Sequence, residues 1–248
     1  LMYFGCPTQA PEMVQVAASR SLEVEATSPQ ALIRAARTDL TPIAKATLGG
    51  LEDELRATEN EEDKIPFYEK MAGEWYRAGH PSISGHYAQL IAEQLYTVAS
   101  AWSTAGTTFS ICIQKTEEEK ERTFCTQRAI KAYQAAISLR PTELDNRLNL
   151  ALTHTYNPPQ DNPMQGILML RELEQQFPKD ARVLVTLAQL AIKTNQFERA
   201  GERLSKAVEL DPANAEAFCL LGRVQETLGQ KENAAASAQR CLELRSNS

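Results

Sequence analysis

The last 68 residues of the chain divide into two halves of 34 residues that align without a gap, at 181–214 and 215–248. Matched positions carry the same kind of side chain: Leu184 with Phe218, Leu187 with Leu221, Ala188 with Gly222, Ala200 with Ala234 and Ala207 with Cys241. Each half contains two apolar stripes with helical spacing. A repeat of this length indicates a helical hairpin that buries its apolar face by stacking on its neighbours.

This pattern resembles that of the tetratricopeptide repeat (TPR) family. Large residues stand at repeat positions 4 and 11, small residues at 8, 20 and 27, and Pro212 at position 32. The small residues let the two helices of a hairpin approach closely, and a proline at position 32 cannot continue the second helix. Pro141 and Pro178 take the same place further upstream.

The same frame extends upstream with insertions, so the resemblance covers residues 65–248. It predicts five units at 65–98, 99–143, 144–180, 181–214 and 215–248. In the unit 144–180 the surplus residues fall between the helices, and we expect Asn162 to cap a second helix that begins at Pro163. We expect Trp102 and Leu187 to be buried where helices pack.

The residues before the repeats form an extension. Residues 29–64 are predicted to contain helices with a break at Thr41-Pro42, and 58–64 a charged connector. Residues 1–28 show no periodicity and are expected to be extended or disordered. Their apolar start fits either the end of a truncated membrane anchor or signal segment, or a plain trimmed arm. The predicted fold class is all-α: a right-handed α-solenoid of about five TPR-like hairpins with an N-terminal helical extension.

Cys112 and Cys125 bracket the sequence IQKTEEEKERTF, the insertion of the unit 99–143. We expect the insertion to lengthen both helices of that hairpin, which would bring the two thiols level with each other. Three alternatives follow: two free thiols, a disulfide, or a metal site, the last disfavoured because no CxxC or histidine pair lies nearby. Cys241 is predicted to be a core thiol and Cys219 a partly exposed one.

The composition excludes several classes of function. The net charge is −6 with no basic tract, which argues against a nucleic-acid partner. No phosphate-binding loop, nucleophile elbow or zinc-protease motif is present. His80, His86 and His154 lie apart from any carboxylate cluster. We therefore predict no catalytic residues, no metal and no cofactor.

The resemblance implies a partner-binding groove, because TPR proteins bind peptides or partner helices with positions 2, 5, 9 and 12 of each first helix. In this chain the corresponding groove residues, with Asn149 from a neighbouring position, are Asp145, Leu148, Asn149, Leu152, Arg182, Val185, Gln189, Glu216, Arg223 and Glu226. The unit 99–143 offers Ser100, Ser103, Thr107 and Ser110. Asn149 and Arg182 also match the carboxylate clamp of some family members, but Ser103, Thr107 and Thr186 replace its other members, which argues against that clamp.

The predicted function is a non-catalytic scaffold that binds another protein or peptide through this groove as part of a hetero-complex. A membrane-associated or envelope assembly is expected, with contact to the membrane only through the N-terminal segment. The location would be periplasmic or otherwise extracytoplasmic, with the cytoplasm as the alternative. The alternative function is an accessory or regulatory subunit of an enzyme complex.

Overall fold

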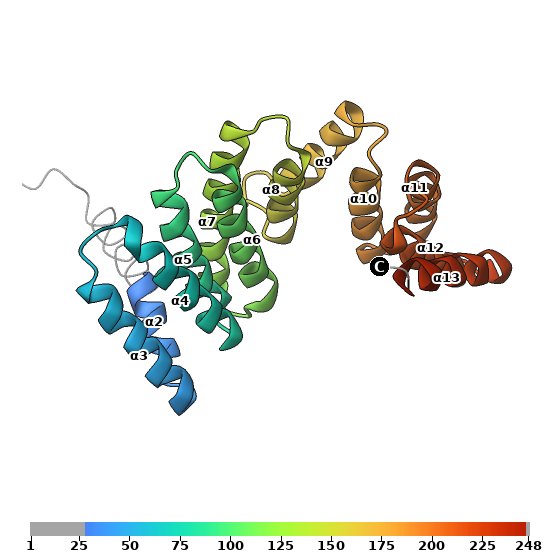
Figure 1. Ribbon diagram of the computed structural model, residues 1–248. Coiled ribbons are helices and arrows are strands. Elements are labelled where there is room, and N and C mark those ends of the chain that lie inside the picture. Colours follow the sequence, from blue (N-terminus) through green and yellow to red (C-terminus); the bar gives the residue numbers. More distant parts are fainter. Residues whose placement is uncertain (1–27, 247–248) are drawn as a thin grey trace, which may run out of the picture. The chain divides into compact units, whose positions relative to one another are not determined.

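The computed structural model describes residues 28–246, which contain helices and connecting turns and no strand (Figure 1). The predicted all-α class is therefore confirmed. Residues 1–27 of the predicted N-terminal arm, which include Cys6, lie outside the described residues. The described chain falls into two compact units, one up to Asn157 and one from Pro158 onward.

The first unit holds seven α-helices among its described residues, with a 3₁₀ turn at Glu62–Lys64. They are α2 (Pro29–Ala36), α3 (Pro42–Ala57), α4 (Ile65–Arg77), α5 (Pro81–Gln94), α6 (Ala99–Lys115), α7 (Glu119–Leu139) and α8 (Leu144–Tyr156). The break predicted at Thr41-Pro42 is present, because the Thr41 hydroxyl accepts a hydrogen bond from the Ala44 amide at the start of α3.

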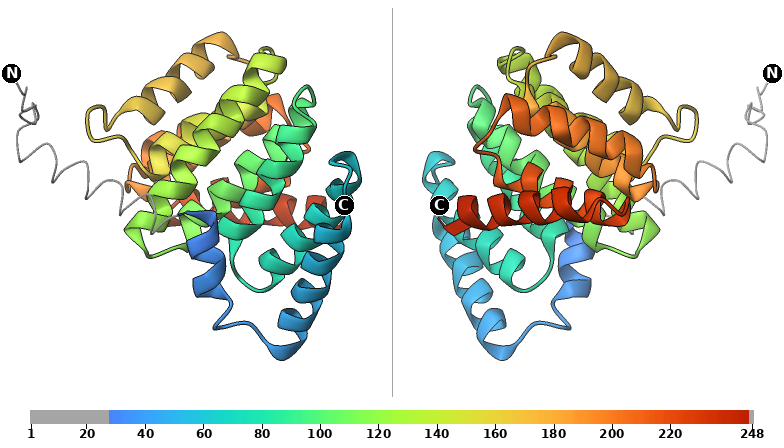
Figure 2. Two further views of the ribbon diagram at one scale, coloured as in Figure 1. Left: turned by 90° about the vertical axis from the view of Figure 1, so that its left-hand side faces the viewer. Right: turned by 90° about the vertical axis from the view of Figure 1, so that its right-hand side faces the viewer.

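Consecutive helices of the first unit pack side by side from α3 to α8, and α2 packs on α5 (Figures 1 and 2). Met71, Trp75 and Ile83 form the centre of the core between α4 and α5 and are almost fully buried. Phe109 and Tyr133 fill the α5–α6 and α6–α7 interfaces, where Gly85 and Gly106 leave room for their rings. A Cβ atom at either glycine would lie 2.7 Å from a ring atom, so both positions require glycine's missing side chain.

The second unit contains α9 (Gln165–Gln176), α10 (Ala181–Lys193), α11 (Phe197–Leu210), α12 (Ala215–Thr227) and α13 (Lys231–Ser246). Its core joins Leu184, Ala188, Ala200, Leu204 and Leu221, all buried, including Ala188 and Ala200 at the small positions of the repeat. Leu187 is also buried, as predicted. The matched pair of helices α12 and α13 approaches so closely that a Cβ atom on Gly222 would lie 3.2 Å from the Ala238 backbone nitrogen.

Three first helices end in the same way at repeat position 15. Gly79, Asn195 and Gly229 have positive φ angles of 89°, 57° and 75°. In each case the residue after this one donates a backbone hydrogen bond back to the helix, as His80 does to the Trp75 carbonyl at 2.9 Å. This is the Schellman ending, which favours glycine or asparagine at the left-handed residue. The repeat frame thus fixes helix ends as well as core positions.

Two predictions about the helices are wrong. Helix α9 begins at Gln165, and not at Pro163, because Asn162 to Gln165 form a turn in which the Gln165 amide donates to the Asn162 carbonyl at 3.1 Å. Trp102 is half-buried and not buried, since its ring lies at the wall of a surface cleft and its Nε1 donates to the Tyr96 carbonyl at 3.0 Å.

The helices of the predicted unit 144–180 belong to different compact units. Helix α8 packs on α7 and α6 in the first unit, and α9 packs on α10 in the second. The division of the chain into five repeat units stays a prediction. The two compact units are described separately below.

Candidate partner-binding site

The predicted groove residues of the second unit lie on α10 and α12, and most are exposed. Arg182, Glu216, Arg223 and Glu226 are exposed, and Gln189 is half-buried. Val185 is only 6% exposed and packs in the core of this unit. The surface that α10 and α12 offer to a partner is therefore charged and polar.

Two polar contacts organise this charged surface. Asp180, the N-cap of α10, accepts a hydrogen bond from the Arg182 amide at 3.0 Å and pairs with the Arg182 guanidinium at 2.7 Å. This contact with Arg182 holds the pKa of the Asp180 carboxyl below its usual value. Gln189 donates from α10 to the Glu216 carboxylate on α12 at 2.7 Å, which joins the two helices.

In the first unit, two of the four hydroxyl residues predicted to line the groove, Ser103 and Ser110, contact α8 instead, whereas Ser100 and Thr107 are exposed. Ser103 donates to the Asn146 side chain at 2.7 Å, and Ser110 lies 3.3 Å from the Thr153 hydroxyl. Asn146 and Thr153 are each 1% exposed. Asp145 is exposed, Leu148 is buried, and Asn149 and Leu152 are half-buried. The sequence analysis missed this buried polar layer between the two helices, and the row of serine and threonine residues on α6 was its only signal.

An apolar groove, also missed by the sequence analysis, lies within the first unit and has a volume of about 530 Å³. Small residues of α4, α5 and α6 line it, among them Ala72, Gly73, Ala88, Ala101 and Thr104. Tyr76, Leu95 and Val98 stand at its side and remain 44%, 36% and 39% exposed. The Lys115 ammonium lies 5.5 Å from the centroid of the Tyr76 ring, which gives this end of the groove a positive charge.

The groove coincides with repeat positions that the family uses for binding. Glu69, Gly73 and Tyr76 occupy positions 5, 9 and 12 of the unit 65–98, and Ser100 occupies position 2 of the next unit. The sequence analysis assigned groove residues only from residue 100 onward. A large exposed tyrosine at position 12 beside a glycine at position 9 was the signal that would have extended the assignment.

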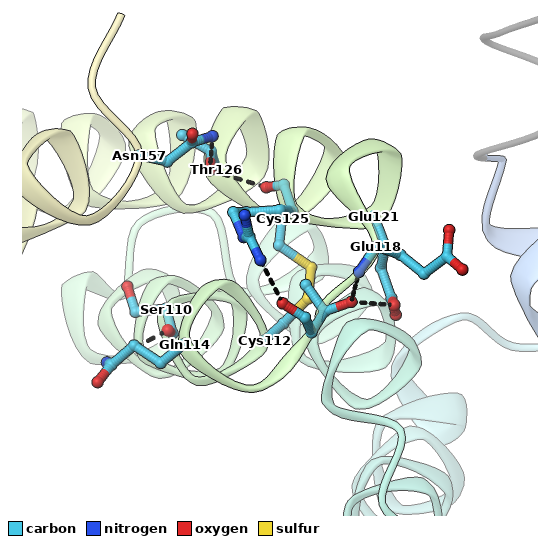
Figure 3. The surroundings of a disulfide bond; sticks show 10 residues. Ser110, Cys112, Gln114, Glu118, Glu121, Cys125, Thr126 and Asn157 are labelled. Carbon is cyan, nitrogen blue, oxygen red and sulfur yellow. Dashed lines mark hydrogen bonds between the residues drawn. A yellow bond between two sulfur atoms is a disulfide. The ribbon is translucent and has the colours of Figure 1, made fainter. Parts of the chain in front are cut away.

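Cys112 and Cys125 form a disulfide between α6 and α7 (Figure 3). Their Cα atoms are 6.1 Å apart and both side chains are fully buried. Helices α6 and α7 reach Lys115 and Glu119, so the insertion lengthens both helices, as predicted. Beyond the disulfide, Arg122 donates to the Thr116 carbonyl and Thr116 to the Glu121 carboxylate, each at 2.7 Å, and these bonds hold the acidic tip in one conformation.

A second disulfide joins Cys219 on α12 to Cys241 on α13, with Cα atoms 5.0 Å apart. Cys241 is buried and Cys219 half-buried, as predicted, but the prediction that they are free thiols is wrong. Repeat positions 5 and 27 belong to the facing sides of one hairpin, and the close approach of α12 and α13 at Gly222 brings the two cysteines within bonding range. Cys219 is consequently not available to a partner as a free thiol.

The histidines do not belong to a metal-binding cluster in the described part of the chain. Among residues 28–246 no three histidine, cysteine, aspartate or glutamate side chains are grouped closely enough to hold a metal ion. Burial, with a smaller effect of Arg128, lowers the pKa of His86 to about 4, and burial also lowers the pKa of His154. Over the same residues, no helix combines the length and the apolar character needed to cross a bilayer.

Comparison with known families identifies the repeats. Two sequence models described as tetratricopeptide repeat match residues 160–224 and 215–248. Residues 160–248 are tetratricopeptide repeats. No curated protein sequence matches the chain. Such repeats support a role as a scaffold for protein–protein interaction, and the exposed residues of α10 and α12 lie inside the matched region.

The solved structures that the chain resembles include two of MamA and one of the TPR protein YrrB, all of low sequence identity. MamA residues 41 to the end from Desulfovibrio magneticus RS-1 is 19% identical over 75% of this chain and 97% of that chain, with a TM-score of 0.45. Another MamA crystal structure is 13% identical over 73% and 92%, with a TM-score of 0.43. YrrB, described as having an unusual peptide-binding site, is 14% identical over 76% and 90%, with a TM-score of 0.40.

Proposed function

We propose that this TPR protein is a non-catalytic docking subunit of a hetero-complex, and that its first contact with a partner protein is the apolar groove of α4, α5 and α6. The observation that carries the proposal is the exposure of Tyr76, Leu95 and Val98 in a groove that is otherwise lined largely by small residues. Large apolar side chains grouped around a groove on a soluble surface are typical of interaction sites.

Gly73, which lines the groove, would let a partner approach the backbone of α4 closely. A glycine inside a helix costs about 1 kcal/mol relative to alanine. At Gly73 a Cβ atom would meet only the end of the Arg77 side chain, at 3.8 Å, so packing within the chain does not require glycine there. A glycine without an internal reason favours close approach by a group from outside the chain.

The charged residues Arg182, Glu216, Arg223 and Glu226 of the second unit supply a second, polar contact in this proposal, and the acidic tip at Glu117–Glu121 a third. Exposed charges contribute more to the rate and specificity of association than to its affinity. We therefore expect the apolar groove to set the affinity, with Asp145, Asn149, Leu152 and Gln189 at the margins of the interface.

Two disulfides favour an oxidising compartment, because cytoplasmic reductants keep most thiols reduced. We propose that the complex operates on the extracytoplasmic side of a membrane, in an envelope assembly. The alternative is that the partner is an enzyme and this chain is its accessory subunit. A captured partner whose catalytic rate changes on binding would favour the alternative.

The test is site-specific photo-crosslinking in the native host. A photoreactive phenylalanine analogue replaces Tyr76, and in a matched control it replaces Lys45, which is exposed on α3 away from the groove. We expect one discrete crosslinked partner from position 76 and none from position 45. The purified partner should then bind the native protein, and bind more weakly when Gly73→Leu fills the groove.

Charge reversal separates the two contacts. Arg182→Glu with Arg223→Glu should slow association of the same partner, whereas Arg199→Glu on α11 should not, although all three arginines are exposed. Equal crosslinking from positions 76 and 45, or unchanged affinity of Gly73→Leu, would contradict the assignment of the groove.

A further inference from the structure

The two disulfides of the chain differ in how much of them solvent can reach. Cys112 and Cys125 are both 0% exposed. Cys241 is 7% exposed, whereas Cys219 on α12 is half-buried. A reagent must therefore open the first unit locally to reach the first bond, but it meets part of Cys219 at the surface of α12.

The surroundings of the cysteines make the same distinction. Ile113 and Phe124, the chain neighbours of the first pair, are buried. Cys219 instead lies near the exposed residues Glu216 and Arg223, which are three residues before it and four residues after it on the same side of α12. One of these is acidic and the other basic, so their charges largely cancel for an anionic reagent. Access to the sulfur, more than charge, then separates the two bonds, and exposed disulfides are the ones that exchange readily.

The Cys219–Cys241 bond joins α12 and α13 at the end of the hairpin away from its turn. Cys219 lies ten residues before Gly229, the left-handed residue of the turn, and Cys241 twelve residues after it. Nearer to the turn, the Ser237 hydroxyl donates to the Gln225 side-chain oxygen at 2.7 Å. Besides their packing, the two helices are thus linked by a hydrogen bond near the turn and by a disulfide at the open end.

Opening of this bond would affect mainly the end of α13. In residues 242–246, which follow Cys241, Leu244 is half-buried and the others are exposed. Nearer to the turn the hydrogen bond stays, and the helices approach so closely that a Cβ atom on Gly222 would lie 3.2 Å from the Ala238 backbone nitrogen. We therefore expect the reduced hairpin to stay folded up to Ala238 and to fray beyond Cys241.

We propose that Cys219–Cys241 is a redox-active disulfide that an external dithiol opens by attack on Cys219, whereas Cys112–Cys125 is purely structural. A thiolate of the dithiol bonds to the Cys219 sulfur, the disulfide breaks, and its electron pair leaves with the Cys241 sulfur, which takes up a proton. The second thiol of the reagent then loses its proton, attacks the first and displaces Cys219 as a thiol. The dithiol is oxidised to a disulfide and the two cysteines are reduced; an external disulfide reverses the reaction.

Thiol mapping of the native full chain tests the proposal. Cys6 is replaced by serine in every sample so that it cannot exchange. Dithiothreitol is added, free thiols are alkylated at intervals, and the labelled cysteines are located by peptide mass spectrometry. We expect Cys219 and Cys241 to be labelled at least about tenfold faster than Cys112 and Cys125, because the second pair requires local opening. In urea the difference should disappear, since unfolding exposes both bonds.

Three outcomes of the mapping would overturn the proposal. The first is equal labelling rates of the two pairs in the native chain, and the second is earlier labelling of Cys112 and Cys125. The third is absence of the Cys219–Cys241 bond from the oxidised protein before dithiothreitol is added.

Two matched variants identify the sulfur that is attacked. Cys241→Ser leaves Cys219 as a thiol at the surface, and Cys219→Ser leaves Cys241 as a buried one. With oxidised glutathione, the Cys241→Ser chain should form a mixed disulfide at Cys219 and release reduced glutathione, whereas the Cys219→Ser chain should stay unmodified. Equal modification of the two variants, with unchanged far-ultraviolet circular dichroism, would contradict attack at Cys219.

Hydrogen exchange of the unsubstituted helices measures the effect on the fold. After reduction, the backbone amides of residues 242–246 should exchange faster, and those of residues 231–238 should keep their rates. The amides of α6 and α7 are the internal control, because Cys112–Cys125 stays closed under the same conditions. Unchanged exchange throughout α13 would contradict the release of its end.

Discussion

Removal of the Cys112–Cys125 disulfide should destabilise the first unit by about 3 kcal/mol. The cysteines are 13 residues apart, so the bond closes a loop of about 14 residues. In the chain-entropy model this loop restricts the unfolded chain by about 10 cal/mol/K, which is about 3.0 kcal/mol at 25 °C. Reduction keeps both cysteine side chains, so it removes the crosslink without the cavity that a truncation would leave.

The assay is urea unfolding followed by tryptophan fluorescence, with and without reductant. Trp75 and Trp102 both lie in the first unit, so this signal reports that unit alone. The measurement uses a Cys219→Ala, Cys241→Ala background, in which the reductant acts on only one structural disulfide. A matched variant that carries Cys112→Ala and Cys125→Ala as well should not respond to the reductant.

A loss of less than about 1 kcal/mol on reduction would refute this reasoning, because engineered and native disulfides that constrain the unfolded chain contribute about 2–4 kcal/mol. Such a result would mean that the reduced unfolded chain already keeps α6 and α7 close together. Mass spectrometry after alkylation, before and after reduction, must first show that the purified protein contains the bond.

Two further predictions concern packing and pH. Gly106→Ala should lower the free energy of unfolding by about 1–3 kcal/mol, because its Cβ would lie 2.7 Å from the buried Tyr133 ring. Gly73→Ala, measured by the same urea unfolding, should instead raise it by about 0.5–1 kcal/mol. Equal effects of the two substitutions would contradict the packing argument. Burial lowers the pKa of His86 to about 4, below the unfolded value of about 6.5, so the unfolded state binds the proton first and stability falls as the pH drops from 6.5 to 4, by up to about 3 kcal/mol. His86→Gln should abolish this part of the pH dependence, whereas His80→Gln should keep it. If the wild type and His86→Gln lost the same free energy of unfolding between pH 6.5 and 4, the prediction for His86 would be refuted.

The repeat pattern could be predicted from the sequence because each of its marked positions is required for one physical reason. Small residues at positions 8 and 20 mark where two helices meet, and a glycine or asparagine at position 15 marks a left-handed helix end. Both signals survive in a single sequence. The start of α9 was misjudged because Asn162 and Pro163 are equally good residues for a turn and for a helix start. Local residue preferences do not distinguish the two when the loop itself is long.

The candidate site was less predictable because burial of a groove position depends on the neighbouring helix. Val185 and Leu148 occupy repeat positions that line the groove in the family, but each is only 6% exposed. Ser103 and Ser110 on α6 likewise bond to α8 and are only half-exposed. In a stack of helices, the exposure of position 5 or 12 is set by how closely the next first helix approaches. That distance depends on side chains more than thirty residues away, and the repeat pattern does not encode it.

Each disulfide joins two helices that also pack closely along their length, α6 with α7 and α12 with α13. Beyond Cys112 and Cys125, Ile113 and Phe124 are still buried, whereas the tip from Gln114 to Thr123 is charged or polar and exposed or half-buried. Helix α13 buries only Ala234, Ser237 and Cys241 among its described residues, all small side chains that contribute little hydrophobic free energy. In a repeat protein each hairpin is stabilised by its own contacts and those with its neighbours. A covalent link within the hairpin adds stability that does not depend on a neighbour. Each disulfide therefore reinforces its hairpin from within, whatever packs on the outer side of that hairpin.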